Sequence, residues 1–503
     1  MAKFTDYLQS TGEIGYVNEA VSSLAYVSGL PGAKVNEVIL FESGESGIVD
    51  SLEEDYIQVL VFAKKPVKTE TKVARTNQIF TIPVGSEYLS QIIDPFGNLL
   101  DKFKPFKKPT TYAEINQIPG GINKRKRISK AFDTGVTLVD MLITLGKGQR
   151  QLIIGDRKTG KTNFLYQTVM TQAQQGNLCI YVAIGKKRTD IKAIERFFAE
   201  NKILDKVIVV ASTSDDPTSI IYLTPYCAMT MAEYFRDQGQ DVVIVLDDLS
   251  THAKFYREIA LLARRFPGRN SYPADIFYAH AKLLERAGNF IANKGEYSIT
   301  CFPVVETVEG DLTGYIPTNL ISMTDGHIYF DIEMFSKGRR PAINPFLSVS
   351  RVGRQTQSNL KRSINREILS FLSLHDRMEK FSHFGAEATT NIKDILSTGE
   401  RISTFFDQEP ERVYSISMQI FIFGLLWSGF WNNKDYNQLK IDIKKIREMY
   451  LSNPTFRQTT DKITEKAESL NDLLTILTQE SPRLLQTIGL TSSGNSQTQN
   501  SKT

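Results

Sequence analysis

The sequence has few cysteines, no long apolar run and a nearly balanced charge. Its three cysteines, Cys179, Cys227 and Cys301, lie far apart in apolar contexts without metal-ligand spacing, so we expect buried, reduced side chains. The longest apolar run, 420–431, is shorter than the span of about 20 residues that a bilayer requires, and the N-terminus lacks signal-peptide order. A net charge of +4 over 503 residues favours no particular partner. These absences predict a cytosolic chain.

The length predicts about three domains. Short β-rich runs separated by Gly, Pro and Asn turns predict an N-terminal β-barrel over 1–83. Over 84–360, the apolar runs QLIIG, NLCIYVAIG, KVIVVAS, DVVIVLDD and SITCFPVVE alternate with helix-length segments, which is typical of a parallel α/β nucleotide-binding domain.

Helical periodicity replaces the strands over 361–490. One apolar face there is predicted to carry Ile463, Ala467, Leu470, Leu474 and Leu477. The polar residues 491–503 are too poor in apolar side chains to offset their ordering entropy, so we expect a disordered tail.

The segment GDRKTGKT has the spacing of a phosphate-binding P-loop. It follows the apolar run QLII directly and opens a helical segment. Such glycines let backbone N–H groups at a helix N-terminus point at phosphate oxygens. We expect Lys161 to contact the β- and γ-phosphates and Thr162 to bind Mg²⁺; a plain glycine loop is the alternative. The candidate nucleotide-binding residues are Gly155, Asp156, Arg157, Lys158, Thr159, Gly160, Lys161, Thr162 and Asn163.

Two further apolar runs end in charged residues. DVVIVLDD supplies Asp247 as the acid on the Mg²⁺ side, whereas Asp248 is better explained as the cap of the next helix. CIYVAIG runs into Lys186, where a hydrolytic site would need a group that accepts a proton from water. A charged lysine only donates, so the sequence predicts binding without hydrolysis.

Two basic features have alternative explanations. The run at 124–127 is either a solvated face or a patch for nucleic acid or another acidic partner. Arg351, followed by Arg354, is either a surface charge or an arginine finger offered to a phosphate in another subunit's site.

Several long motifs identify the family that this chain resembles. GDRKTGKT, CIYVAIGKKR, VIVLDDLS, RRFPGRNSYPADIFYAHAKLLERA, PVVETVEGDLTGYIPTNLISMTDGHIYF and GRRPAINPFLSVSRVG together resemble the alpha subunits of F-type rotary ATPases, strongly from about 130 to 360 and weakly after about 390. The resemblance implies a β-barrel, a RecA-like P-loop domain and a C-terminal helical bundle. It also implies three copies alternating with three catalytic beta-type subunits around a gamma-type shaft, peripheral on the cytoplasmic face of the cell membrane.

The resemblance implies roles for single residues. The subunit holds Mg-ATP, or ADP, without turnover, with Lys186 at a position that is commonly glutamine in the family. Arg351 maps to a finger that acts in trans on the beta subunit, and Ser322 and Val349 map to the shared interface. Asp247 maps to the Mg²⁺-side acid, acting through water.

Residues around the adenine map to Phe335, Arg340 and Gln408. The sequence departs from the family at Lys158, where the loop usually has glutamine, and at Pro410, in place of a second adenine-side glutamine. About one helical turn precedes the barrel, where the family has a longer arm that meets the peripheral stalk.

Three alternatives differ in function. The shorter arm and the lysine- and asparagine-rich composition favour a specialised copy, as in wall-less bacteria, that drives other work than ATP synthesis. A purely structural subunit would keep its nucleotide permanently bound, and the nucleotide would stabilise the folded chain. A hexameric RNA translocase similar to the Rho terminator shares the barrel-plus-RecA plan, but it needs exposed aromatics beside basic residues; none are persuasive, so we expect no nucleic acid.

Overall fold

The structure is a computed structural model that describes residues 4–100, 106–292, 295–383, 390–432 and 434–490. The chain forms two compact units, each assembled from separate stretches of sequence. The first comprises the residues up to 128, 147–157 and 172–327, and the second comprises 129–146, 158–171 and the residues from 328. These units cut across the expected domain limits at 83 and 360, which stay a prediction. The expected tail, 491–503, lies outside the described residues.

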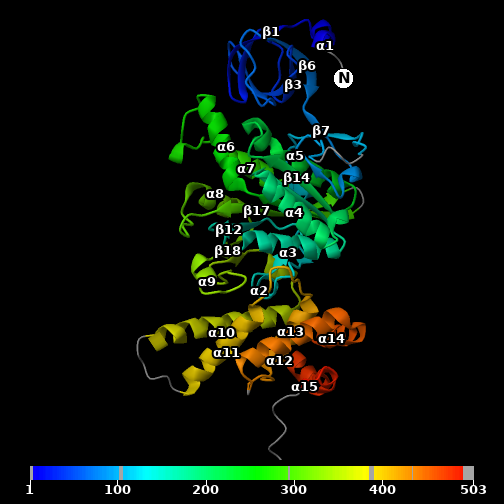
Figure 1. Ribbon diagram of the computed structural model, residues 1–503, viewed down its shortest axis with the longest axis vertical. Helices are drawn as coiled ribbons and strands as arrows, with labels where there is room; N and C mark the ends of the chain where they lie inside the picture. The colour runs from blue at the N-terminus through cyan, green and yellow to red at the C-terminus, as the bar shows by residue number, and fades with distance from the viewer. Residues whose placement is uncertain (1–3, 101–105, 293–294, 384–389, 433, 491–503) are drawn as a thin grey trace, which may run out of the picture. The chain divides into compact units, whose positions relative to one another are not determined.

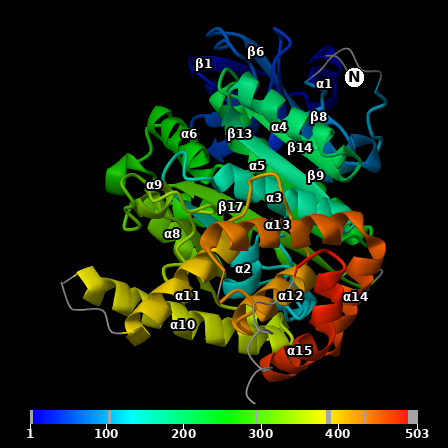
Figure 2. The ribbon, with the colours of Figure 1, turned by 60° about the horizontal axis from the view of Figure 1, so that its bottom comes forward.

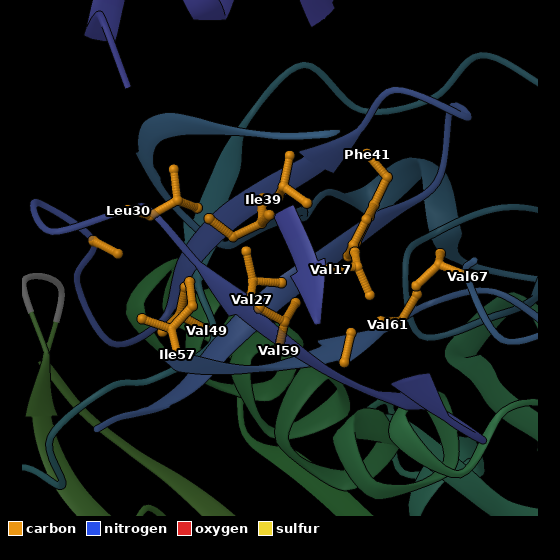
Figure 3. Close-up of a cluster of buried hydrophobic side chains, with 13 residues drawn as sticks. Val17, Val27, Leu30, Ile39, Phe41, Val49, Ile57, Val59, Val61 and Val67 are labelled. Carbon is orange, nitrogen blue, oxygen red and sulfur yellow. The ribbon is translucent and has the colours of Figure 1, made fainter. Parts of the chain in front are cut away.

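A closed barrel of antiparallel strands begins the first unit. The strand order is β1, β2, β5, β4, β3, β6, and β6 pairs with β1 to close the ring. Inward side chains such as Val27, Phe41 and Val59 fill its interior with aliphatic and aromatic atoms (Figure 3). The bounds are β1 (Gly15–Val21), β2 (Leu24–Ser28), β3 (Glu37–Phe41), β4 (Ser46–Leu52), β5 (Ile57–Val61) and β6 (Lys72–Ile79).

The barrel also buries a charged group. The carboxylate of Glu37 is 2% exposed and accepts a hydrogen bond from Nε of Arg75 at 3.2 Å. Arg75 also donates to Glu13 at 2.9 Å, so these buried charges are paired, as charges removed from water must be. Before Glu13 lies α1 (Phe4–Thr11), whose eight residues make about two turns rather than the one expected.

Six parallel strands form the sheet of the first unit. Their order is β12, β17, β15, β13, β14, β8, and β16 pairs antiparallel with β17. The apolar runs predicted as strands are buried almost throughout, as expected for strands covered on both faces. The bounds are β8 (Ile92–Ile93), β12 (Gln151–Gly155), β13 (Leu178–Lys186), β14 (Val207–Thr213), β15 (Val242–Asp247), β16 (Gly288–Ala292) and β17 (Gly295–Glu306).

Helices α4, α5 and α6 pack against this sheet (Figure 1). All three cysteines are buried, as predicted, and none of them forms a disulfide. A small antiparallel pair joins β7 (Thr81–Pro83) and β9 (Tyr112–Glu114). The helices of this unit are α4 (Arg188–Glu200), α5 (Thr218–Asp237), α6 (Leu249–Leu262), α7 (Ile276–Leu284) and α8 (Tyr315–Met323).

The second unit is mainly helical (Figure 2). It contains β10 (Ala131–Phe132), α2 (Thr137–Leu142), β11 (Leu145–Gly146), most of α3 (Lys161–Gln174), most of β18 (Gly326–Phe330), α9 (Ile332–Ser336) and β19 (Val349–Ser350). The long helices are α10 (Asn359–His383), α11 (Thr390–Phe406), α12 (Ile416–Trp427), α13 (Tyr436–Ser452), α14 (Pro454–Lys466) and α15 (Leu470–Gln486).

Most of the longest apolar run lies in α12, which ends at Trp427 and contacts α11, α13, α14 and α15. Gly424 permits this packing, because a Cβ there would lie 2.3 Å from Cδ1 of Leu477. In the part of the chain that the structure describes, no helix has the length and apolar character to cross a bilayer.

The single apolar face predicted in this region is wrong. Ala467 ends α14, and the side chain of Ser469 caps α15 by accepting from the backbone of Asp472. Ile463 and Leu477 are both buried, but they belong to different helices. The helical spacing of apolar residues continues across the break between α14 and α15 because each of the two helices buries one side.

Candidate functional site

The P-loop begins at Gly155, the last residue of β12, and its last two residues, Lys161 and Thr162, open α3. Gly160 has φ +101°, a conformation that glycine adopts without the steric cost of a Cβ. Lys158 also has a left-handed backbone conformation, with φ 63°. This conformation is uncommon for residues other than glycine. Lys161 is 8% exposed, whereas Thr162 and Asn163 are exposed on the first turn of the helix. The loop therefore has the strand, turn and helix that phosphate binding requires.

The first residues of the loop are held by the segment that follows β17. Asp156 is buried and accepts hydrogen bonds from the hydroxyl of Thr307 and from the backbone N–H of Gly310, the latter at 3.0 Å. Nε of Arg157 donates to Glu306 at 2.7 Å. These contacts give Asp156 and Arg157 a positioning role, which sequence analysis did not separate from direct nucleotide contact.

Neighbouring strands bring acidic and basic groups to the same end of the sheet. In the parallel register, Gly155 of β12 lies opposite Glu306 of β17, and Ala183 of β13 lies opposite Asp247 of β15. The carboxyl ends of parallel strands form the edge where ligands of open α/β sheets bind. Asp247 and the start of the P-loop therefore share this edge of the first unit.

Lys186 bridges the two aspartates at the end of β15. Its Nζ lies 2.9 Å from Oδ1 of Asp247 and 3.1 Å from Oδ2 of Asp248. The other oxygen of Asp247 accepts the hydroxyl of Tyr181 at 2.7 Å. Burial would lower the pKa of Lys186, but the two carboxylates raise it above its usual value. Lys186 is therefore a charged donor with no lone pair for a proton from water.

Asp248 caps α6, as predicted. Its Oδ1 accepts a hydrogen bond from the backbone of Thr251 at 2.7 Å, which satisfies one of the donors left at a helix start.

The residues around Asp247 do not fit a divalent cation well. Mg²⁺ beside a nucleotide needs negative charge from the protein, usually through water, and Lys186 already cancels part of that charge. Among the described residues, no group of three or more His, Cys, Asp or Glu side chains could hold a metal ion. The assignment of Mg²⁺ to Thr162 and Asp247 stays a prediction.

The residues predicted around the adenine lie close together in the second unit. The guanidinium of Arg340 stacks over the ring of Phe335 at 3.7 Å from its centroid, and the backbone N–H of Gln408 donates to the carbonyl of Arg340 at 2.8 Å. Arg340, Gln408 and Pro410 line a cavity of about 390 Å³. This volume lies in the range of small-molecule sites.

Every hydrogen-bonding position of the Gln408 side-chain amide is occupied by another group of the protein. Its Oε1 accepts from the backbone and hydroxyl of Thr137 at 2.9 and 3.0 Å, and its Nε2 donates to the carbonyls of Gly135 and Arg412 at 2.7 Å each. An amide has two donors and two acceptor lone pairs, so none remains for a base. Adenine recognition by Gln408 stays a prediction.

The predicted interface residues are exposed. Val349 begins β19 and is 40% exposed, and Arg351 follows that strand with its side chain exposed. Ser322 lies on α8 of the first unit and donates to the carbonyl of Asn319 at 2.6 Å. These positions are compatible with contacts to another subunit.

The basic run is not a uniform solvated face. Arg125 donates to the carbonyls of Gly120 and Ala287, and its guanidinium lies 4.9 Å from the centroid of Phe290. Lys124 and Lys126 beside it are exposed. One arginine of the run therefore has a structural role.

Sequence analysis missed Tyr181, which holds the second oxygen of Asp247. Its signal was a hydroxyl-bearing side chain within the buried run CIYVAIG, where a polar atom requires a partner.

Comparison with known proteins finds one matching family model and many similar sequences. Residues 135–350 match the ATP synthase alpha/beta family, nucleotide-binding domain. Three similar proteins are each named ATP synthase subunit alpha. That of Dictyoglomus thermophilum is 41% identical over 89% of this chain and 88% of its own length. That of Carsonella ruddii is 38% identical over 93% and 99%, and that of Mycoplasma genitalium is 37% identical over 91% and 89%.

Proposed function

Since this chain belongs to the ATP synthase alpha/beta family, we propose that it is an alpha-type subunit that holds ATP or ADP without hydrolysing it. The observation that carries the proposal is Lys186 at the carboxyl end of β13, within hydrogen-bond distance of both Asp247 and Asp248. Hydrolysis needs a group there that orients or deprotonates water. A lysine ammonium offers hydrogens only.

The P-loop is the proposed phosphate site. Its backbone N–H groups and the start of α3 would face phosphate oxygens, and Lys161 would contact the β- and γ-phosphates. Arg340 would border the base because it lines the candidate pocket, and Phe335 would hold the Arg340 guanidinium in place by stacking against it.

Arg351 is the proposed link to catalysis. Its exposed guanidinium would enter the nucleotide site of a beta-type subunit and stabilise charge on the transferring phosphoryl group. Ser322 and Val349 would border that shared interface. Three such chains would alternate with three beta-type subunits around a gamma-type shaft, on the cytoplasmic face of the membrane.

Two variants distinguish a subunit that contributes a residue to catalysis from a subunit whose bound nucleotide only stabilises the assembly. Arg351→Ala should lower ATP turnover of the assembled complex by about 10³-fold or more, as losses of arginine fingers do, while the isolated chain still binds nucleotide. Lys161→Ala should abolish nucleotide binding by the chain. Unchanged turnover in Arg351→Ala, together with failed assembly in Lys161→Ala, would favour the purely structural role. Sustained hydrolysis by the isolated wild-type chain would refute the whole proposal.

The proteins that copurify with this chain would identify the machinery that the complex drives. Copurification with a membrane rotor ring would indicate an ion-coupled ATPase or ATP synthase. Other machinery in its place would indicate the specialised copy.

A further inference from the structure

Lys186 places a fixed positive charge where a divalent cation is expected beside a nucleotide. Its Nζ lies 2.9 Å from Asp247, a distance typical of charge-assisted hydrogen bonds, and 3.1 Å from Asp248, still within hydrogen-bond distance. The side chain of Lys186 is 23% exposed, and those of Asp247 and Asp248 are 11% and 4% exposed. Partial burial strengthens the interaction, because screening by water is weaker than at the surface.

The surrounding hydrogen bonds fix this arrangement. Asp247 is oriented from its other oxygen by Tyr181 at 2.7 Å. Asp248 is held at the start of α6 by the backbone of Thr251 at 2.7 Å. Both carboxylates are therefore positioned independently of Lys186, and the ammonium completes a cluster of two negative charges and one positive charge.

A divalent cation would gain less at this cluster than at a free carboxylate. Mg²⁺ loses its water shell reluctantly and relies on negative charge nearby. The ammonium cancels part of that charge and would repel the ion. A neutral glutamine at the same position would leave the charge of Asp247 available.

We propose that Lys186 takes the place of the divalent cation beside Asp247, so that this chain holds its nucleoside di- or triphosphate with little dependence on Mg²⁺. The inference rests on the proposed function, since it concerns the same nucleotide site.

The test is the affinity of the purified full-length chain for ATP and ADP, by calorimetric titration with either Mg²⁺ or EDTA. For the wild type, the ratio of the two dissociation constants should stay within about threefold. For Lys186→Gln, affinity should fall about tenfold or more when Mg²⁺ is removed. Lys186→Arg, which keeps the charge, should behave like the wild type. Lys187→Gln is the matched control because Lys187 is the exposed neighbour.

A second measurement does not depend on the folding of any variant. Mn²⁺ binding to the wild-type chain saturated with ATP, followed by electron paramagnetic resonance, should be no tighter than Mn²⁺ binding to free ATP. A tenfold loss of wild-type ATP affinity in EDTA, or tight Mn²⁺ binding by the wild-type complex, would overturn the inference and leave the nucleotide-holding role intact. No ATP or ADP binding with or without Mg²⁺ would overturn that role itself.

Discussion

Gln408 should stabilise the second unit rather than select the base. Replacing it with alanine removes four hydrogen bonds, two from Thr137 and two to the carbonyls of Gly135 and Arg412. The side chain is 5% exposed, so water cannot readily replace these bonds. At a net value of about 0.5–1.5 kcal/mol for each of the four bonds, Gln408→Ala should lower the free energy of unfolding by about 2–6 kcal/mol. That is a large part of the usual 5–15 kcal/mol of a folded domain.

Tryptophan fluorescence during urea unfolding can measure this loss. The two tryptophans of the chain, Trp427 and Trp431, both lie in the second unit, so the signal reports on the unit that contains Gln408. Glu411→Gln is the control, because Glu411 is exposed three residues away. The preference for ATP over GTP should be the same in Gln408→Ala as in the wild type. An unchanged unfolding midpoint with an altered preference would refute this reasoning and support adenine recognition.

Two further predictions concern stability. Burial lowers the pKa of His252 to about 4, below the unfolded value of about 6.5. The folded protein therefore keeps its full stability above about pH 6.5, where His252 is neutral in both states. The free energy of unfolding should fall by about 3 kcal/mol as the pH drops from about 6.5 to about 4, because the unfolded state binds a proton that the folded state does not. His252→Gln should flatten this slope in urea titrations across pH, and an equally steep slope would contradict the assignment. Asp442→Ala should cost about 3 kcal/mol by urea unfolding, because Lys434 and Nε1 of Trp431 lose a buried partner. Asp442→Asn should cost less, since an amide oxygen can still accept from the indole; equal losses would refute this account.

The sequence predicted the strands of the sheet because their apolar runs are continuous and bounded by turns. It did not predict which acid Lys186 contacts. The pairing of β13 with β14 shifts between Ala183 and Lys186, so alternation along the strand no longer indicates where the last side chain points. The partners of Gln408 were equally hidden, because Thr137 lies 271 residues away. Local patterns specify elements, whereas such contacts depend on how distant segments pack.

The closure of the barrel by β1 and β6 limits how neighbours can recognise this end of the chain. A complete ring of paired strands leaves no row of unpaired backbone groups along which another chain could add a strand. A protein that binds this barrel would therefore contact its outward side chains, which can change without disturbing the aliphatic interior. The outward side chains could thus be substituted to suit a different binding partner while the fold of the barrel stays the same.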